Sequence, residues 1–194
     1  KGTIRADKLI LATGADPEAT KQLAGIDIPQ RSTPGVIAIT KPMPQLMNHI
    51  VVAPGIHMHQ RHDGRIVLGE QDGAPQNKAH AMRLKNRPNN FPNQAFAKQH
   101  FDRMMVIAKK FLPEIDGAEM DEVHIGWRPL PLDGHPVLGA TATRPDVYMA
   151  IMHSGVSLAP LAGHLVASEI VEGVSLPDLA EYRPDRDFKN IKRY

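Results

Sequence analysis

A candidate strand over residues 4–12 constrains the fold most, because its last four residues are all apolar and end at a Thr13-Gly14 turn. An unbroken apolar run is typical of a strand that is covered on both faces, whereas a strand with one wet face alternates. Such a strand needs parallel neighbours, which are joined by crossover helices. The residues before it are too few to supply them. We therefore expect the chain to be a fragment.

The composition places the chain among globular proteins. It has 194 residues, of which 42% are apolar, enough for one core and a small second one. Its 23 basic residues nearly cancel the 21 acidic ones, so nucleic acid is not an expected partner. The chain has no Cys, which fits a reducing compartment, and we expect a cytoplasmic location. No apolar run approaches the roughly 18 residues that span a membrane, so membrane association is not indicated.

The first part of the chain predicts a short helix followed by antiparallel strands. The helix covers residues 17–23 and ends at Gly25. The strands are expected at residues 36–40, 49–53, 57–62 and 65–69. The last two strands form a hairpin, because Asp63-Gly64 between them suits a two-residue turn with left-handed backbone.

The second part of the chain begins with a polar stretch. Residues 72–93 are rich in Asn, Pro and Gln, which is typical of a long surface loop, a lid or a disordered insert. Apolar residues at helical spacing predict a helix over residues 95–112, and Pro113 ends it. Two strands follow, at residues 119–127 and 147–152, and then a helix at residues 158–172. The charged residues 182–194 are expected to form a peripheral tail.

These elements predict an α+β fold. An antiparallel sheet with one covering helix interrupts an α/β layer, of which the chain holds only the last strand and the last helix. We expect segment boundaries at residues 1–30, 31–127, 128–181 and 182–194. The junction between that last strand and last helix is important for function, because ligands bind at such junctions in α/β layers.

Residues 153–160 make this junction, with Ser157 as the expected N-cap and Pro160 in the first helical turn. The start of a helix carries unpaired N–H groups and partial positive charge, so it can bind a group that becomes anionic, such as a reduced flavin. The alternative is an ordinary strand–turn–helix without a ligand. Ser154 and Ser157 do not indicate a serine hydrolase, because the segment lacks the GxSxG pattern.

Three segments in order resemble the D-amino acid oxidase-like superfamily of FAD-dependent oxidoreductases, which includes glycine oxidase, sarcosine oxidase and D-amino acid dehydrogenase. They are residues 11–15 (LATGA), residues 126–139 (GWRPLPLDGHPVLG) and the junction at residues 153–160 (HSGVSLAP). The GxGxxG loop that holds the pyrophosphate in this family has no counterpart in the chain. The chain thus resembles the carboxy-terminal half of such an enzyme.

The resemblance assigns a role to each segment. Residues 1–30 and 128–181 would belong to an FAD-binding domain, residues 31–127 to a substrate-binding domain, and residues 182–194 to a charged tail. The implied cofactor is FAD. Residues near its adenosine or pyrophosphate would follow the first strand, and residues near the flavin would open the last helix. These implied cofactor-binding residues are Ala12, Thr13 and Gly14, and Ser154, Gly155, Val156, Ser157 and Leu158.

Two further residues would contact substrate. Arg128 matches a position that clamps a substrate carboxylate in several relatives, a task for which a planar guanidinium is suited. An ordinary ion pair is the alternative for Arg128. His153 stands where some relatives have a second Arg, so it could bind substrate, accept a proton or pack beside the flavin.

A histidine-rich strand invites a metal site, since His57 and His59 share one face. Arg61 shares that face and would repel a cation, and no nearby carboxylate or Cys completes a ligand set, so no metal is expected. In the family this sheet helps to form the substrate pocket. His59, Gln60 or Arg61 could therefore reach substrate, and the sequence leaves open which face points inward.

Two functions remain. In the first, the chain is part of an oxidoreductase that oxidises the C–N bond of an amino acid or secondary amine by hydride transfer to FAD, without need of a side-chain base. The implied partners are this small-molecule substrate and a missing amino-terminal FAD-binding half or separate subunit. In the second, the chain is a non-catalytic, truncated substrate-domain module that needs such a half. If the purified chain is yellow and an amino acid bleaches its visible absorbance, the first function holds for the chain itself. A colourless chain that becomes active only when an amino-terminal half is added would support the second.

Overall fold

A computed structural model describes residues 2–70 and 90–189 of the chain. The chain divides into two compact units, one of residues 1–31 and 128–194 and the other of residues 32–127. The polar stretch predicted at residues 72–93 falls mostly outside the described residues. Within the described ranges, no helix has the length and apolar character that a membrane crossing needs.

The sheet of the first unit has three strands in the order β1-β8-β7. They are β1 (Leu9–Leu11), β7 (Val137–Ala140) and β8 (Val147–Ile151). Strand β1 is parallel to β8, and β7 is antiparallel to it. The apolar run is typical of a strand covered on both faces, but the described residues leave β1 partly uncovered, since Leu9 is 44% exposed and Ile10 is 50% exposed. Within the described residues, β1 has a hydrogen-bonded neighbour on one edge only.

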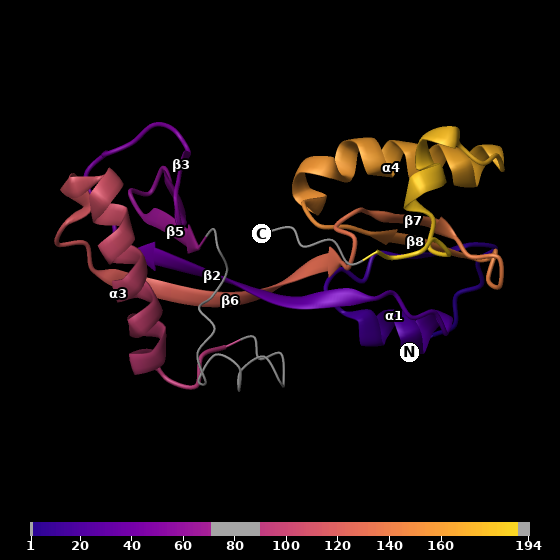
Figure 1. Cartoon of the computed structure of the whole chain (residues 1–194), viewed down its shortest axis with the longest axis horizontal. Helices are drawn as coiled ribbons and strands as arrows, with labels where there is room; N and C mark the ends of the chain where they lie inside the picture. Colours follow the sequence, from indigo (N-terminus) through magenta and orange to yellow (C-terminus); the bar gives the residue numbers. More distant parts are fainter. Residues whose placement is uncertain (1, 71–89, 190–194) are drawn as a thin grey trace. The chain divides into compact units, whose positions relative to one another are not determined.

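Helices α1 (Pro17–Ala24) and α4 (Gly155–Glu172) cover opposite faces of this sheet (Figure 1). Alternation along the strands sends Val137, Met149 and Ile151 into the core on the α1 side, and Leu138 and Tyr148 into the core on the α4 side. The predicted helix at residues 17–23 is confirmed, and the Asp16 carboxylate caps it by accepting from the Ala19 N–H at 2.9 Å.

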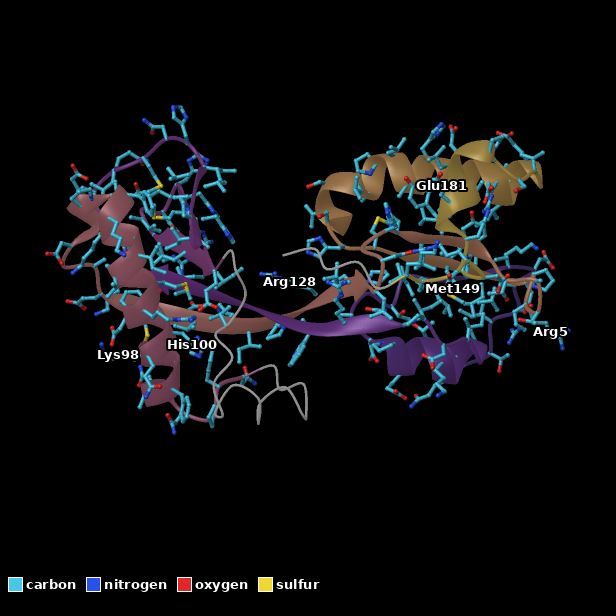
Figure 2. The ribbon with its side chains drawn as sticks, viewed as in Figure 1. Arg5, Lys98, His100, Arg128, Met149 and Glu181 are labelled. Atoms are coloured by element: carbon cyan, nitrogen blue, oxygen red, sulfur yellow. The ribbon has the colours of Figure 1, made fainter. Side chains whose placement is uncertain are left out.

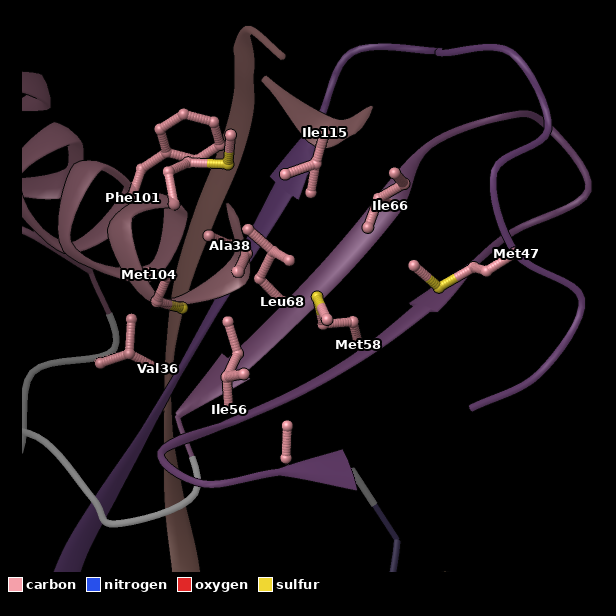
Figure 3. Packing of buried hydrophobic residues seen from close by; sticks show 13 residues of the cluster. Val36, Ala38, Met47, Ile56, Met58, Ile66, Leu68, Phe101, Met104 and Ile115 are labelled. Carbon is pink, nitrogen blue, oxygen red and sulfur yellow. The ribbon is translucent and has the colours of Figure 1, made fainter. Parts of the chain in front are cut away.

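The second sheet has five strands in the order β3-β4-β5-β2-β6. They are β2 (Gln30–Thr40), β3 (Val51–Ala53), β4 (Ile56–Gln60), β5 (Ile66–Glu70) and β6 (Met120–Pro131). Helix α3 (Gln94–Phe111) covers one face, where Phe101 and Met104 pack on Met58 and Leu68 (Figure 3). A short 3₁₀ helix, η1 (Pro113–Ile115), follows α3. The prediction of a mixed α+β fold, with an antiparallel sheet and a covering helix, is confirmed.

The hairpin between β4 and β5 is confirmed, but its turn differs from the prediction. The Arg61 N–H donates to the Arg65 carbonyl at 2.8 Å, and the Gly64 N–H donates to the Arg61 carbonyl at 2.9 Å, so three residues form the loop. Gly64 has φ +84°, whereas Asp63 has no positive φ. A two-residue turn of the predicted type needs positive φ at both central residues. The observed loop needs it only at Gly64.

The start of α4 was placed too late by the sequence pattern. The helix begins at Gly155 rather than at residue 158, so Ser157 is inside it and is not the N-cap. Pro160 lies beyond the first turn, where its ring leaves one backbone carbonyl of the preceding turn without its usual donor. The signal of an N-cap Ser followed by Pro was misleading, because Ser154 precedes the helix instead.

Arg128 was expected at the end of a strand, followed by a turn stiffened by proline. It lies inside β6, which continues to Pro131. Proline cannot donate a hydrogen bond within a sheet, and Pro129 and Pro131 are tolerated because β6 is an edge strand. The turn comes after them, where the Gly134 N–H donates to the Pro131 carbonyl at 2.8 Å.

The prediction of a peripheral tail is wrong for the residues that follow the 3₁₀ helix η2 (Pro177–Tyr182). Arg186 pairs with the buried carboxylate of Asp133 at 2.7 Å, and Arg183 pairs with the buried carboxylate of Glu169 at 2.5 Å. A buried carboxylate without a partner is costly, so these two guanidinium groups fix the segment on the first unit.

Candidate functional site

The parallel pairing of β1 and β8 brings two predicted cofactor segments together. Leu11 lies opposite Met149, so both strands end at the same edge of the sheet. Residues 12–14 follow the carboxyl end of β1, and residues 152–154 follow the carboxyl end of β8 (Figure 1). Ligands of open α/β sheets bind outside the carboxyl ends of the strands. We call this edge the β1/β8 corner.

Ser154 gives the corner its sharp turn. It has φ 59° and ψ 29°, and among the described residues it is the one non-glycine with positive φ. This conformation costs an L-residue roughly 1–2 kcal/mol. The Ser154 hydroxyl does not cap α4 but lies 2.9 Å from Nδ1 of His153.

The first amides of α4 point out of the corner. The N–H groups of Ser157 and Leu158 both donate to the Ser154 carbonyl at 3.0 Å. Within the described part of the chain, the N–H groups of Gly155 and Val156 have no hydrogen-bond partner. Unpaired amides at a helix N-terminus attract negative charge. They can stabilise a group that becomes anionic during a reaction.

Two apolar side chains in the first two turns of α4 are exposed. Val156 is 97% exposed and Leu161 is 61% exposed. A Cβ atom added at Gly155 would meet nothing closer than Cγ of Met152, at 3.7 Å. The described residues therefore leave the start of α4 uncovered, with an apolar surface beside free donors.

Arg128 and His153 share one neighbourhood of the first unit. Both side chains are half-buried. Burial, and after it the positive charge of Arg128, lowers the pKa of His153 below its ordinary value. Arg128 lies on β6 (Figure 2). Burial and the charge of Arg128 thus both favour the neutral form of the His153 imidazole.

An unsatisfied acceptor at the start of β2 lies next to the segment after β1. The side chain of Gln30 donates from Nε2 to the Gly14 carbonyl at 3.3 Å, while its Oε1 is buried and has no partner within the described residues. Gly14 has φ 61°, and the hydroxyls of Thr13 and Thr20 lie 2.5 Å apart. A buried acceptor without a donor is costly, and a bound ligand or water would supply one. Sequence reasoning missed Gln30, since only the fold brings it to Gly14.

The three predicted substrate residues of the second unit have different surroundings. Alternation places His57 and His59 on the face of the sheet opposite α3, and His59 is half-buried there. The Gln60 amide bonds the backbone between residues 43 and 47, for example accepting from the Leu46 N–H at 2.7 Å, which favours a structural role. Arg61 lies 3.6 Å from the Asp63 carboxylate.

The face of this sheet opposite α3 also explains Gly69. A Cβ atom there would lie 2.0 Å from Nε2 of His57, so the glycine makes room for the imidazole ring. Residues 57 and 69 are cross-strand partners. Across the described residues, no group of three His, Cys, Asp or Glu side chains has the geometry to hold a metal ion.

A hollow of about 340 Å³ in the first unit is lined by Tyr148, Glu169 and Arg183 but by none of the predicted site residues. Burial alone would raise the pKa of Glu169, but hydrogen bonds from Arg183 and Tyr148 lower it to about 2. The Leu176 N–H donates to the same carboxylate at 2.6 Å. Because its acceptors are engaged by this chain, we assign Glu169 a structural role.

Comparisons with known proteins match most of the chain to one family. The sequence profile of the family described as FAD dependent oxidoreductase matches residues 1–169. Glycine oxidase of Pseudomonas putida is 23% identical over 186 residues, which are 95% of this chain and 47% of that protein. The chain thus spans about half the length of the curated relatives it matches.

Solved structures show the same fold. The crystal structure of glycine oxidase from Geobacillus kaustophilus superposes with a TM-score of 0.68 at 23% identity, covering 97% of this chain and 48% of that one. The crystal structure of L-proline dehydrogenase from P. horikoshii gives a TM-score of 0.72 at 20% identity, covering 91% of this chain and 46% of that one.

Proposed function

Because the chain belongs to the FAD dependent oxidoreductase family, we propose that it is the carboxy-terminal part of an enzyme that oxidises the C–N bond of an amino acid or secondary amine. The observation that carries this proposal is the β1/β8 corner, where the segments after two parallel strands meet beside two unpaired amides. Relatives named glycine oxidase and L-proline dehydrogenase support the substrate class.

The residues of the corner suit FAD. The buried Oε1 of Gln30 lacks a donor, and the surface above Gly155 is open. We propose that Ala12, Thr13 and Gly14 contact the adenosine or pyrophosphate side, and that residues 154–158 contact the flavin. Bound FAD would supply the oxidising chemistry by accepting a hydride from the carbon next to the substrate nitrogen. The amides of Gly155 and Val156 would hold the negative charge that this transfer creates.

Arg128 is the proposed anchor for a substrate carboxylate. Its planar guanidinium can make two parallel hydrogen bonds to a carboxylate. His153, in the same neighbourhood, is the second proposed substrate contact. His59 and Arg61, on the second unit, are proposed to shape the side-chain pocket. No side chain of the chain is needed as a base when the substrate nitrogen is a neutral amine.

The proposal includes an amino-terminal FAD-binding portion, in a longer polypeptide or a separate subunit. The described part of β1 leaves one strand edge open and Ile10 half-exposed. Val156 and Leu161 add apolar surface that is exposed at the start of α4. Parallel strands are stable when they are covered, so a further strand and its helices would bury this surface.

The test compares the chain with its complete parent or with a co-expressed amino-terminal half. We expect the complete protein to be yellow and its visible absorbance to fall when an amino acid or secondary amine is added without oxygen. The chain alone is expected to be colourless. A complete protein that binds FAD but is bleached by none of these substrates would support the non-catalytic alternative. A complete protein without flavin would contradict the proposal.

A further inference from the structure

Ser154 has a left-handed backbone conformation that the chain otherwise reserves for glycine. At every other described position with positive φ the residue is Gly, which adopts this conformation without steric cost. Backbone strain that persists at a candidate site points to a use for the side chain that causes it. A glycine at residue 154 would avoid the strain, so we expect the hydroxyl of Ser154 to have a task.

The hydroxyl of Ser154 contacts the imidazole ring of the preceding residue. Within the described residues its one hydrogen-bond partner is Nδ1 of His153, at 2.9 Å. It does not cap α4, although Ser154 occupies the N-cap position. Successive side chains of a strand point to opposite faces, whereas the left-handed turn after β8 brings these two consecutive side chains together. The strained conformation thus serves a contact with the ring of His153.

This contact matters because a neutral imidazole has one nitrogen that donates and one that accepts. The partner of one ring nitrogen decides which of them carries the proton. Burial lowers the pKa of His153, which favours the neutral ring. If the Ser154 hydroxyl donates to Nδ1, the proton of the ring is on Nε2. If the hydroxyl accepts from Nδ1, Nε2 has no proton.

We propose that Ser154 is a positioning residue, whose hydroxyl donates to Nδ1 of His153 and so keeps an N–H group on Nε2 for a carboxylate ligand. The inference rests on the proposed function, in which His153 contacts the substrate, and it adds the residue that orients His153. A carboxylate can only accept hydrogen bonds. A protonated Nε2 therefore binds it, whereas an unprotonated Nε2 would repel it.

The test uses the complete, FAD-loaded protein, with acetate as the carboxylate probe and calorimetry to measure its dissociation constant. Ser154→Gly removes the hydroxyl and keeps the left-handed turn, so its midpoint of urea unfolding should equal or exceed that of the wild type. We expect it to bind acetate about two- to tenfold more weakly, which is the effect of one lost hydrogen bond.

A double-mutant cycle shows whether Ser154 acts through His153. His153→Ala should weaken acetate binding, and Ser154→Gly added to His153→Ala should weaken it no further. The matched control is His164→Ala, because His164 is exposed on α4; it should bind acetate as the wild type does.

NMR spectroscopy of the histidine ring nitrogens tests the direction of the hydrogen bond. The signals of His153 are identified by their loss in His153→Ala. At a pH where the ring is neutral, we expect a proton on Nε2 and none on Nδ1 in the wild type. A proton on Nδ1 would overturn the inference.

The binding data separate failure of the inference from failure of the proposed function. Suppose that His153→Ala weakens acetate binding, but Ser154→Gly has no effect, or has the same effect with and without the imidazole. Ser154 then does not act through His153, and the inference is wrong while the proposed function stands. If acetate does not bind, or binds equally well to His153→Ala, the proposed substrate contact of His153 fails and the inference fails with it.

Discussion

Arg183→Met is expected to destabilise the first unit strongly, because it leaves a buried carboxylate without its cation. The Glu169 side chain is 4% exposed, and Arg183 donates to both of its oxygens, at 2.8 and 2.5 Å. Gly139 allows this approach, since a Cβ atom there would lie 2.7 Å from the guanidinium. Methionine keeps the length of the side chain and removes the charge.

The expected loss of stability can be worked out from the ion pair between Arg183 and Glu169. Breaking a buried ion pair by removing one partner costs about 3–5 kcal/mol. The pKa of Glu169 is 4.5 in an ordinary environment and about 2 in the fold, a difference worth about 3 kcal/mol. Because the folded pKa is the lower one, this stability is complete above about pH 5 and is lost as the pH falls towards 2. The gap between wild type and variant should narrow by about 2 kcal/mol between pH 7 and pH 3.

Urea unfolding followed by circular dichroism at pH 7 and pH 3 measures both quantities. Arg144→Met is the matched control, since Arg144 pairs with Asp146 at the surface, where the side chains are 41% and 54% exposed. It should lose less than about 1 kcal/mol. A loss in Arg183→Met no larger than in this control, or a gap that stays constant with pH, would refute the assigned role of the pair.

Three further predictions concern the site and the hairpin. Arg128→Ala should raise the substrate KM at least about thirtyfold, because a desolvated charge contact contributes roughly 2–5 kcal/mol to binding. An unchanged KM in steady-state kinetics would show that Arg128 does not bind the substrate. Gly155→Val should lower the flavin-to-protein absorbance ratio, because the added side chain would occupy the space proposed for the flavin. The chain should stay folded, since its own atoms leave room for a side chain at residue 155. Full flavin occupancy would argue against a flavin at the start of α4. Gly64→Ala should destabilise by about 1–2 kcal/mol in urea unfolding, because Gly64 has φ +84° and its Cβ would lie 2.8 Å from the Met43 carbonyl oxygen. Gly117 has φ +83° and no neighbour within 4 Å of an added Cβ atom, so Gly117→Ala should lower the free energy of unfolding by less. Equal losses in the two variants would show that the contact with Met43 does not contribute.

The sequence predicted the elements whose signals are local. The helical spacing over residues 95–112 and the stop at Pro113 located α3 to within one residue. The Asp63-Gly64 dipeptide located the hairpin, although not its loop length, because one residue with positive φ already closes the loop. The apolar stretch at residues 147–152 predicted β8. Such signals depend on neighbours in the chain and are visible without the fold.

Features that depend on distant parts of the chain were not predicted. Two prolines after Arg128 suggested a turn, and only the position of β6 at a sheet edge shows why they are tolerated in a strand. The charged tail looked peripheral until the fold paired Arg183 with Glu169 and Arg186 with Asp133. Likewise, residues 12–14 and the junction at residues 153–160 were each predicted as cofactor-binding segments, but their juxtaposition depends on the pairing of β1 with β8.

The proposed function depends most on whether the amides that open α4 face the flavin. A crystal structure of the complete protein with FAD bound would show where the flavin lies. We expect the pyrimidine edge of the flavin within hydrogen-bond distance of the Gly155 and Val156 amides, with the Arg128 guanidinium lining the same space. Amides covered by side chains of the missing half, with the flavin bound elsewhere, would contradict it.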